Sequence, residues 1–284
     1  MKPLSMFAAA IGLSMACTAW ADAPVIVTYE SAGASPASIT PARDAFRTAI
    51  GGGTVPSANG SFGGLRREIN WDGVPLAFSD PGLLPGNFFN TTSPRGVVLS
   101  TPGTGFLVSA NAGGATPVLF GFPNDFQPFR AQKLFTAVNS NITDVRFFLP
   151  GTATAAGTSA FGLIFVDVEV AGATHLDFFD MSETLIWSHD AAVSGNQGLS
   201  FLGATVSGSA IGRVRITSGS NTIVSNGVLG NLIDDVVVMD DFLYAEPLQV
   251  TAVPEPSSVA LTAFGLLGLV ASLRRGRFPA RRNA

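Results

Sequence analysis

Six aspartates in three acidic segments are the residues of this chain best suited to bind a cation. Two adjacent pairs flank an apolar run of four residues, 236–239, and a third segment lies upstream. If the apolar run is the core of a buried strand, a rise of about 3.3 Å per residue puts the two pairs roughly 17–20 Å apart, so they cannot share one ion. One pair can still join the third segment around a hard cation such as Ca²⁺, which prefers oxygen ligands. The alternative is that these aspartates are solvated and cap strand ends and turns. The six are Asp177, Asp180, Asp234, Asp235, Asp240 and Asp241.

A loop at residues 71–95 combines turn-forming residues with aromatic side chains. Such a loop on a β-sandwich can stack its rings on the apolar face of a sugar, and Trp71, Phe88 and Phe89 are the candidates for this contact. Phe is abundant throughout the chain, with 22 residues in all, so the aromatic residues of the loop need no ligand to explain them. We therefore expect an ordered surface loop with its rings buried beneath it, and the sugar contact is the alternative.

Few residues match the arrangements that enzymes use. The chain has two histidines, His175 and His189, and lacks the G-x-S-x-G turn, the H-E-x-x-H helix and the phosphate-binding loop. A glycoside hydrolase needs two carboxylates about 5–10 Å apart across a cleft, and no spacing in the sequence singles out such a pair. We therefore expect no catalytic residues and no cofactor other than Ca²⁺; a secreted glycan-active enzyme is one alternative.

The elements that must position these residues are mostly strands. Short runs rich in Val, Ile and Phe are separated by clusters of Gly, Pro, Asn and Ser, which predicts an all-β fold, a single jelly-roll-like β-sandwich over residues 22–252. One short helix is predicted at 40–50, with Thr40 as its cap, Pro41 in its first turn and three glycines after it. The predicted strands are 25–29, 65–70, 96–100, 105–110, 117–122, 133–137, 142–149, 160–170, 174–179, 184–188, 199–206, 211–217, 221–225 and 235–244.

Residues 1–21 have the features of a secretory signal peptide, with an apolar helical core and the small residues Ala19 and Ala21 before the cleavage site. Cleavage there removes Cys17, so the mature chain, beginning at Asp22, contains no disulfide. Residues 22–252 hold 10 Lys and Arg against 19 Asp and Glu, a net charge near −9. That balance argues against nucleic acid as a partner.

The C-terminus combines three features in order. The prolines of segment 253–256 favour an extended, accessible backbone. The 17 uncharged residues 257–273 span about 25 Å as a transmembrane helix, a little less than a hydrocarbon core of roughly 30 Å. Segment 274–284 is rich in arginine, which favours a cytoplasmic end. The residues concerned are Val253, Pro254, Glu255 and Pro256 in the motif and Arg274, Arg275 and Arg277 in the basic stop.

These three features together, behind an N-terminal signal, resemble the PEP-CTERM sorting signal of Gram-negative bacteria, over residues 252–284. In that family an exosortase, a membrane protease-transpeptidase, recognises the Pro-Glu-Pro motif and processes the protein near it. Its substrates are common in bacteria that export exopolysaccharide. The resemblance implies that the chain is anchored transiently in the inner membrane and then reaches the cell surface or the extracellular space; an ordinary membrane anchor is the alternative. More loosely, segments 161–169, 199–203 and 211–216 resemble exported jelly-roll or concanavalin-like domains.

The sequence thus predicts an exported, non-catalytic protein of the cell surface or biofilm matrix. Its expected partners are the exosortase, polysaccharide and, before processing, the inner membrane. A carbohydrate-binding module, with or without Ca²⁺, is the first alternative, and a secreted glycan-active enzyme is the second.

Overall fold

The computed structural model describes residues 23–51, 57–110, 118–130, 132–224, 227–228 and 234–250. Residues 24–250 form one compact unit, and the fold below is that of this unit. No helix among the described residues is long and apolar enough to cross a membrane. The predicted leader, 1–21, and the predicted sorting segments, 253–256, 257–273 and 274–284, lie outside the described residues.

The unit is built mainly of strands, as the sequence predicts. Its helices are α1 (Pro36–Ile50) and α2 (Phe88–Thr91), with 3₁₀ turns at Leu76–Phe78 and Val118–Gly121. The strands are β1 (Val25–Gly33), β2 (Arg66–Ile69), β3 (Leu83–Leu84), β4 (Val97–Ser100), β5 (Gly105–Val108), β6 (Phe135–Val138), β7 (Ile142–Phe147), β8 (Ala160–Val166), β9 (His175–Asp180), β10 (Leu185–Asp190), β11 (Leu199–Ser207), β12 (Ile211–Thr217), β13 (Ile223–Val224), β14 (Gly227–Val228) and β15 (Val238–Ala245).

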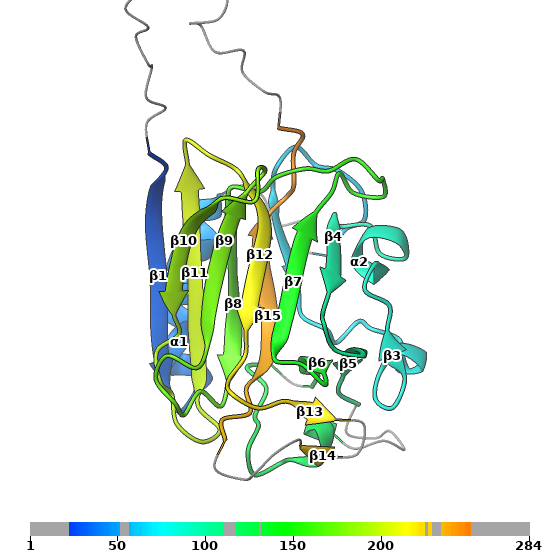
Figure 1. The fold of residues 1–284 in the computed structure, drawn as a ribbon, viewed down its shortest axis with the longest axis vertical. Helices are drawn as coiled ribbons and strands as arrows, with labels where there is room; N and C mark the ends of the chain where they lie inside the picture. The colour runs from blue at the N-terminus through cyan, green and yellow to red at the C-terminus, as the bar shows by residue number, and fades with distance from the viewer. Residues whose placement is uncertain are drawn as a thin grey trace, which may run out of the picture. The chain divides into compact units, whose positions relative to one another are not determined.

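The strands form two sheets that lie face to face (Figure 1). The larger sheet has the order β1-β11-β8-β15-β6-β13-β14, with β2 paired to β15, and β5 paired to both β3 and β6. The smaller sheet has the order β10-β9-β12-β7-β4. All pairings are antiparallel except that of β13 with β6. This arrangement is a β-sandwich, in agreement with the prediction.

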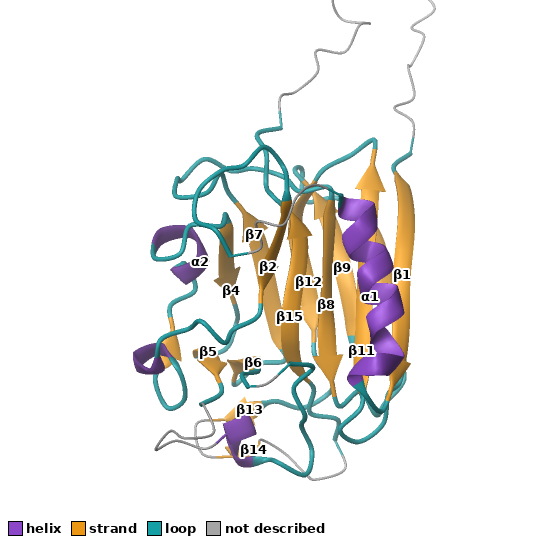
Figure 2. Ribbon diagram, turned by 180° about the vertical axis from the view of Figure 1, so that it is seen from behind, coloured by secondary structure: helices purple, strands orange, loops and turns teal. Residues whose placement is uncertain are grey.

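Strand β8 shows why the larger sheet is buried on both faces. Phe161, Leu163 and Phe165 belong to the apolar cluster between the sheets. Ile164 and Val166 alternate with them and belong to a second cluster, which α1 covers (Figure 2). Because successive side chains of a strand point to opposite faces, an uninterrupted apolar run fits a strand covered on both sides.

Helix α1 packs on the outer face of the larger sheet through Phe46, which is fully buried. A Cβ atom at Gly162 would lie 3.1 Å from the Phe46 ring, so the glycine makes room for it. The helix begins at Pro36, one turn earlier than predicted. Thr40 is therefore inside the helix, where its hydroxyl donates to the Pro36 carbonyl at 2.7 Å, and Pro41 is not in the first turn.

Two predicted strands differ from the structure. Residues 118–121 form a 3₁₀ turn rather than part of a strand, with left-handed φ angles at Leu119 and Phe120. Strand β15 begins at Val238, not at 235, so Asp235 precedes the strand, whereas Asp240 and Asp241 lie within it.

Candidate functional site

The sequence-predicted sorting residues cannot be placed in this fold. The signal-cleavage pair Ala19 and Ala21, the motif at 253–256 and the three arginines of the basic stop lie outside the described residues. The search for a site therefore concerns residues 24–250.

The three aromatic residues proposed for sugar stacking are buried. Trp71, Phe88 and Phe89 are only 1%, 5% and 3% exposed. Trp71 stacks on Phe135 with ring centroids 4.0 Å apart, and its edge meets Phe242 at 5.0 Å. The sugar-stacking alternative is therefore wrong for these three side chains, whose ring faces contact other core residues. The preferred prediction, an ordered loop above buried rings, is confirmed.

The backbone of Trp71 is strained. Its φ angle is 62°, a left-handed conformation that is unusual for a bulky residue and typically costs about 1–3 kcal/mol. The ring stack and a hydrogen bond from the indole Nε1 to the Asp240 carbonyl oxygen, at 3.0 Å, hold it there. Such strain persists only where the surrounding structure enforces it.

The loop around Trp71 encloses a cavity of about 110 Å³, which we call the Trp71–Arg95 cavity. Its floor is aromatic and its rim includes the exposed residues Gly73 and Pro75. The lining residues are Asn70, Trp71, Gly73, Val74, Pro75, Phe88, Phe89, Ser93 and Arg95.

Arg95 is the one lining residue that carries a charge. Its Nη1 donates to the Glu68 carbonyl oxygen at 3.0 Å, and its guanidinium lies 5.3 Å from the centre of the Phe89 ring. Its Nε is buried without a hydrogen-bond partner among the described residues. Burial is the main cause that lowers the pKa of Arg95; the Tyr244 hydroxyl opposes this and the nearby cation Arg67 adds to it.

A buried lysine ties the cavity's loop to the start of β6. The Lys133 Nζ donates to the Val74 carbonyl oxygen at 2.5 Å and to the Ser79 hydroxyl at 3.0 Å. The Asp72 carboxylate accepts hydrogen bonds from the backbone N–H groups of Gln132 and Lys133. Burial lowers the pKa of Lys133 and Asp72 opposes the shift. The loop thus has polar anchors at Asp72, Val74 and Ser79, all of which follow Trp71 in the chain.

Asp240 and Asp241 form a second charged feature, at a β-bulge. Between the pairs Met239–Phe165 and Phe242–Leu163, two residues of β15 stand opposite the single residue Ile164 of β8. Both residues are buried, at 1% and 2% exposed, and the Phe129 to which Asp240 is bonded belongs to the second apolar cluster. The expectation of solvated aspartates at a strand end is wrong for this pair, because the sequence does not reveal the bulge.

The charged form of these two carboxyl groups is disfavoured by their surroundings. The Asp240 Oδ2 accepts a hydrogen bond from the Phe129 N–H at 2.6 Å, but the Oδ1 atoms of both aspartates have no partner among the described residues. Burial raises the pKa of Asp240 well above its ordinary value, and repulsion from Asp241 adds to the rise. Burial raises the pKa of Asp241 to about 6, and the cation Arg130 opposes that rise. The two carboxyl groups therefore take up protons as a coupled pair.

The remaining candidate aspartates do not join this pair. Asp177 belongs to the smaller sheet. It stands opposite Arg215 of the neighbouring strand β12, and its charge acts on that arginine. Asp180 caps a turn by accepting from the N–H groups of Ser182 and Thr184, as the solvated alternative predicts. Asp235 is buried and accepts from the backbone of Val170, whereas Asp234 is exposed.

No group of three or more His, Cys, Asp or Glu side chains within the described ranges is arranged to hold a metal ion. Two carboxylates are fewer ligands than Ca²⁺ usually takes. Calcium binding therefore stays a prediction, and the six aspartates are not one site in this fold.

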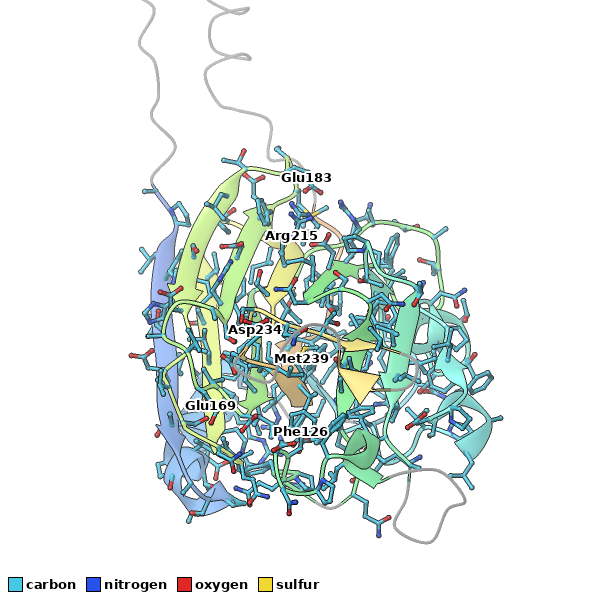
Figure 3. The ribbon with its side chains drawn as sticks, turned by 60° about the horizontal axis from the view of Figure 1, so that its bottom comes forward. Phe126, Glu169, Glu183, Arg215, Asp234 and Met239 are labelled. Atoms are coloured by element: carbon cyan, nitrogen blue, oxygen red, sulfur yellow. The ribbon has the colours of Figure 1, made fainter. Side chains whose placement is uncertain are left out.

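The exposed face of the smaller sheet carries charges that pair with one another. Arg213 contacts Asp144 at 3.0 Å and Glu183 at 2.7 Å, and Arg215 contacts Asp144 at 2.8 Å. Figure 3 shows Glu183 and Arg215 toward one end of the sandwich and Glu169 and Phe126 toward the other. The histidines are peripheral: His189 lies 3.0 Å from Glu30, and His175 lies 3.7 Å from Asp177.

No known protein identifies either feature. No family model, curated protein or solved structure matches this chain. The Trp71–Arg95 cavity and the Asp240–Asp241 pair therefore have to be interpreted from their own chemistry.

Sequence reasoning found the aromatic lining of the cavity but missed Arg95. A single arginine after a Ser-Pro dipeptide carries no motif, and its lack of a carboxylate partner is visible only in three dimensions. Among the described arginines, only Arg95 and the exposed Arg130 have no carboxylate at salt-bridge distance in the structure.

Proposed function

We propose that this chain is an exported, non-catalytic protein that an exosortase sorts to the cell surface or the exopolysaccharide matrix. The observation that carries the proposal is the order of the C-terminal features: Pro254-Glu255-Pro256, an uncharged run of 17 residues, and an arginine-rich end. An N-terminal signal sequence at 1–21 supplies the export step that such a tail requires.

The proposal assigns a role to each part of the chain. The leader directs export and is removed after Ala21, and residues 257–273 hold the precursor in the inner membrane as a helix. The exosortase then processes the chain near the motif and releases the jelly-roll-like body, residues 22–252. The body's acidic balance, 10 basic against 19 acidic residues, suits a domain that does not bind nucleic acid or an anionic surface non-specifically.

The test of sorting is the mass of the mature C-terminus in the native host. Glu255→Ala is expected to leave an unprocessed precursor in the inner membrane, and deletion of the exosortase is expected to do the same. Glu246→Gln is an unsuitable control, because Glu246 pairs with Arg67 in the core at 2.6 Å. Asp234→Asn, at an exposed position, is the matched control and should be processed normally. Normal processing of the Glu255 variant would contradict the proposal.

A further inference from the structure

The Arg95 guanidinium is a partly buried cation with no carboxylate at salt-bridge distance among the described residues. It is half-buried, it lines a cavity, and only its Nη1 makes a hydrogen bond within the described residues. Its neighbour Arg67 has the Glu246 carboxylate at 2.6 Å, whereas no carboxylate of the described chain pairs with Arg95. A charge removed from water is costly unless it is paired and hydrogen-bonded.

We propose that the Trp71–Arg95 cavity binds the carboxylate group of a ligand, and that Arg95 is the residue that binds it. The ligand that suits an exported matrix protein is a uronic acid unit of an acidic polysaccharide. The choice of a glycan rests on the proposed function; the choice of a carboxylate rests on the cavity alone.

The guanidinium geometry favours a carboxylate over other groups. With Nη1 bonded to the Glu68 carbonyl oxygen and Nε buried, Nη2 is the guanidinium nitrogen left for a ligand. A hydrogen bond from Nη2 to a carboxylate oxygen is charge-assisted, and it places a counterion beside the guanidinium. A neutral hydroxyl can accept the same hydrogen bond but leaves the charge without a counterion.

The size of the cavity limits what enters it. At about 110 Å³ it is smaller than the 300–1,000 Å³ or so of typical ligand pockets, so it takes one end of a ligand and not a whole oligosaccharide. The rest of the ligand passes the exposed rim at Gly73 and Pro75. The aromatic floor at Phe88 and Phe89 excludes water from beneath the bound group, which strengthens the electrostatic contact.

The walls of the cavity are already positioned for binding. Trp71 is held by its stack on Phe135 and its bond to the Asp240 carbonyl, and Lys133 holds the loop at Val74. A site whose side chains are fixed before the ligand arrives avoids part of the entropy cost of binding.

The experiment titrates the mature protein, purified from its host, with three probes: glucuronate, propionate and glucose. We expect both carboxylates to bind and glucose to bind about tenfold more weakly or not at all, as measured by calorimetry. Arg95→Lys keeps the charge but loses the planar guanidinium and the position of its Nη2, and should weaken glucuronate about tenfold; Arg95→Gln should weaken it about 100-fold. Arg146→Gln removes an exposed, paired arginine and is the matched control, with unchanged affinity expected.

Three results would overturn the proposal: no binding of either carboxylate by folded wild-type protein, equal binding of glucose, or unchanged affinity in both Arg95 variants. Tighter binding of glucuronate than of propionate supports a uronic acid as the ligand; equal binding supports a carboxylate site but overturns the choice of a uronic acid. Circular dichroism of each variant separates lost binding from lost folding. Sorting is tested independently, because the mass of the mature C-terminus does not depend on Arg95.

Discussion

The Trp71–Arg95 cavity and the Asp240–Asp241 pair both take charge out of water, but they compensate for it in different ways. They are joined by one hydrogen bond, from the Trp71 indole to the Asp240 carbonyl oxygen. Two neighbouring carboxyl groups can lose half of their charge by binding a proton, and the raised pKa values of the pair reflect this. A guanidinium cannot lose its proton in the same way, since it stays protonated in proteins at any pH near neutrality. Because of this difference, Arg95 rather than the aspartate pair is the group that we expect to bind a ligand of opposite charge.

Replacing two neighbouring arginines by methionine tests this comparison with the largest expected effect. Arg67→Met removes the salt-bridge partner of the buried Glu246 carboxylate and should lower the free energy of unfolding by about 3–5 kcal/mol. Arg95→Met leaves no carboxylate of the described residues without a partner. It should change the free energy of unfolding by less than about 1 kcal/mol, while abolishing carboxylate binding. Urea unfolding of the three proteins measures both effects. An equally large loss in the Arg95 variant would show that its charge is already compensated within the fold.

The pH dependence of stability tests the acid pair. The pKa of Asp241 is about 6 in the folded chain against 3.8 in the unfolded chain, so between these values the folded state holds more protons. The free energy of unfolding should therefore fall as the pH rises from about 4 to about 6, and the repulsion should persist at higher pH. The contribution is about 3 kcal/mol at most, because one pKa unit corresponds to about 1.4 kcal/mol.

Asp241→Asn removes this contribution, so its stability should increase relative to wild type as the pH is raised from 4 to 7. The charged groups facing Asp241 are Arg130, Arg43, Glu68 and Asp240, and all of them are retained in the variant. Exposed Asp234→Asn is the control and should keep the wild-type slope. Parallel unfolding profiles for wild type and Asp241→Asn would contradict the shifted pKa.

The hydrogen bond that joins the two regions has the smallest expected effect. Trp71→Phe keeps an aromatic ring over Phe135 but leaves the Asp240 carbonyl without its indole donor. We expect a loss of about 1–3 kcal/mol in the free energy of unfolding and a weaker carboxylate site, because the strained loop is no longer held. Trp187→Phe, at a half-buried position outside the cavity, is the control. Equal losses in the two variants would show that the bond has no special role.

Part of this structure follows from local sequence patterns. The alternating and apolar runs predict most of the strands, and the uninterrupted run at 160–166 already indicates a strand buried on both faces. The sequence misplaces the start of α1, because Thr40 and Pro41 form a plausible cap although the chain is helical from Pro36. It also misplaces Asp240 and Asp241, because a bulge adds one residue to a strand without changing the residue types around it.

The sequence by itself determined the strand content, the acidic balance of the body and the sorting prediction for both ends of the chain. These features depend on composition, on residue spacing and on the restricted backbone of proline, all of which are local. Only the tertiary structure decided that Trp71, Phe88 and Phe89 are buried, that two adjacent aspartates are buried at a bulge of β15, and that Arg95 lines a cavity without a carboxylate partner among the described residues. These properties depend on which distant segments exclude water from a charge, and neighbours in the chain do not specify that.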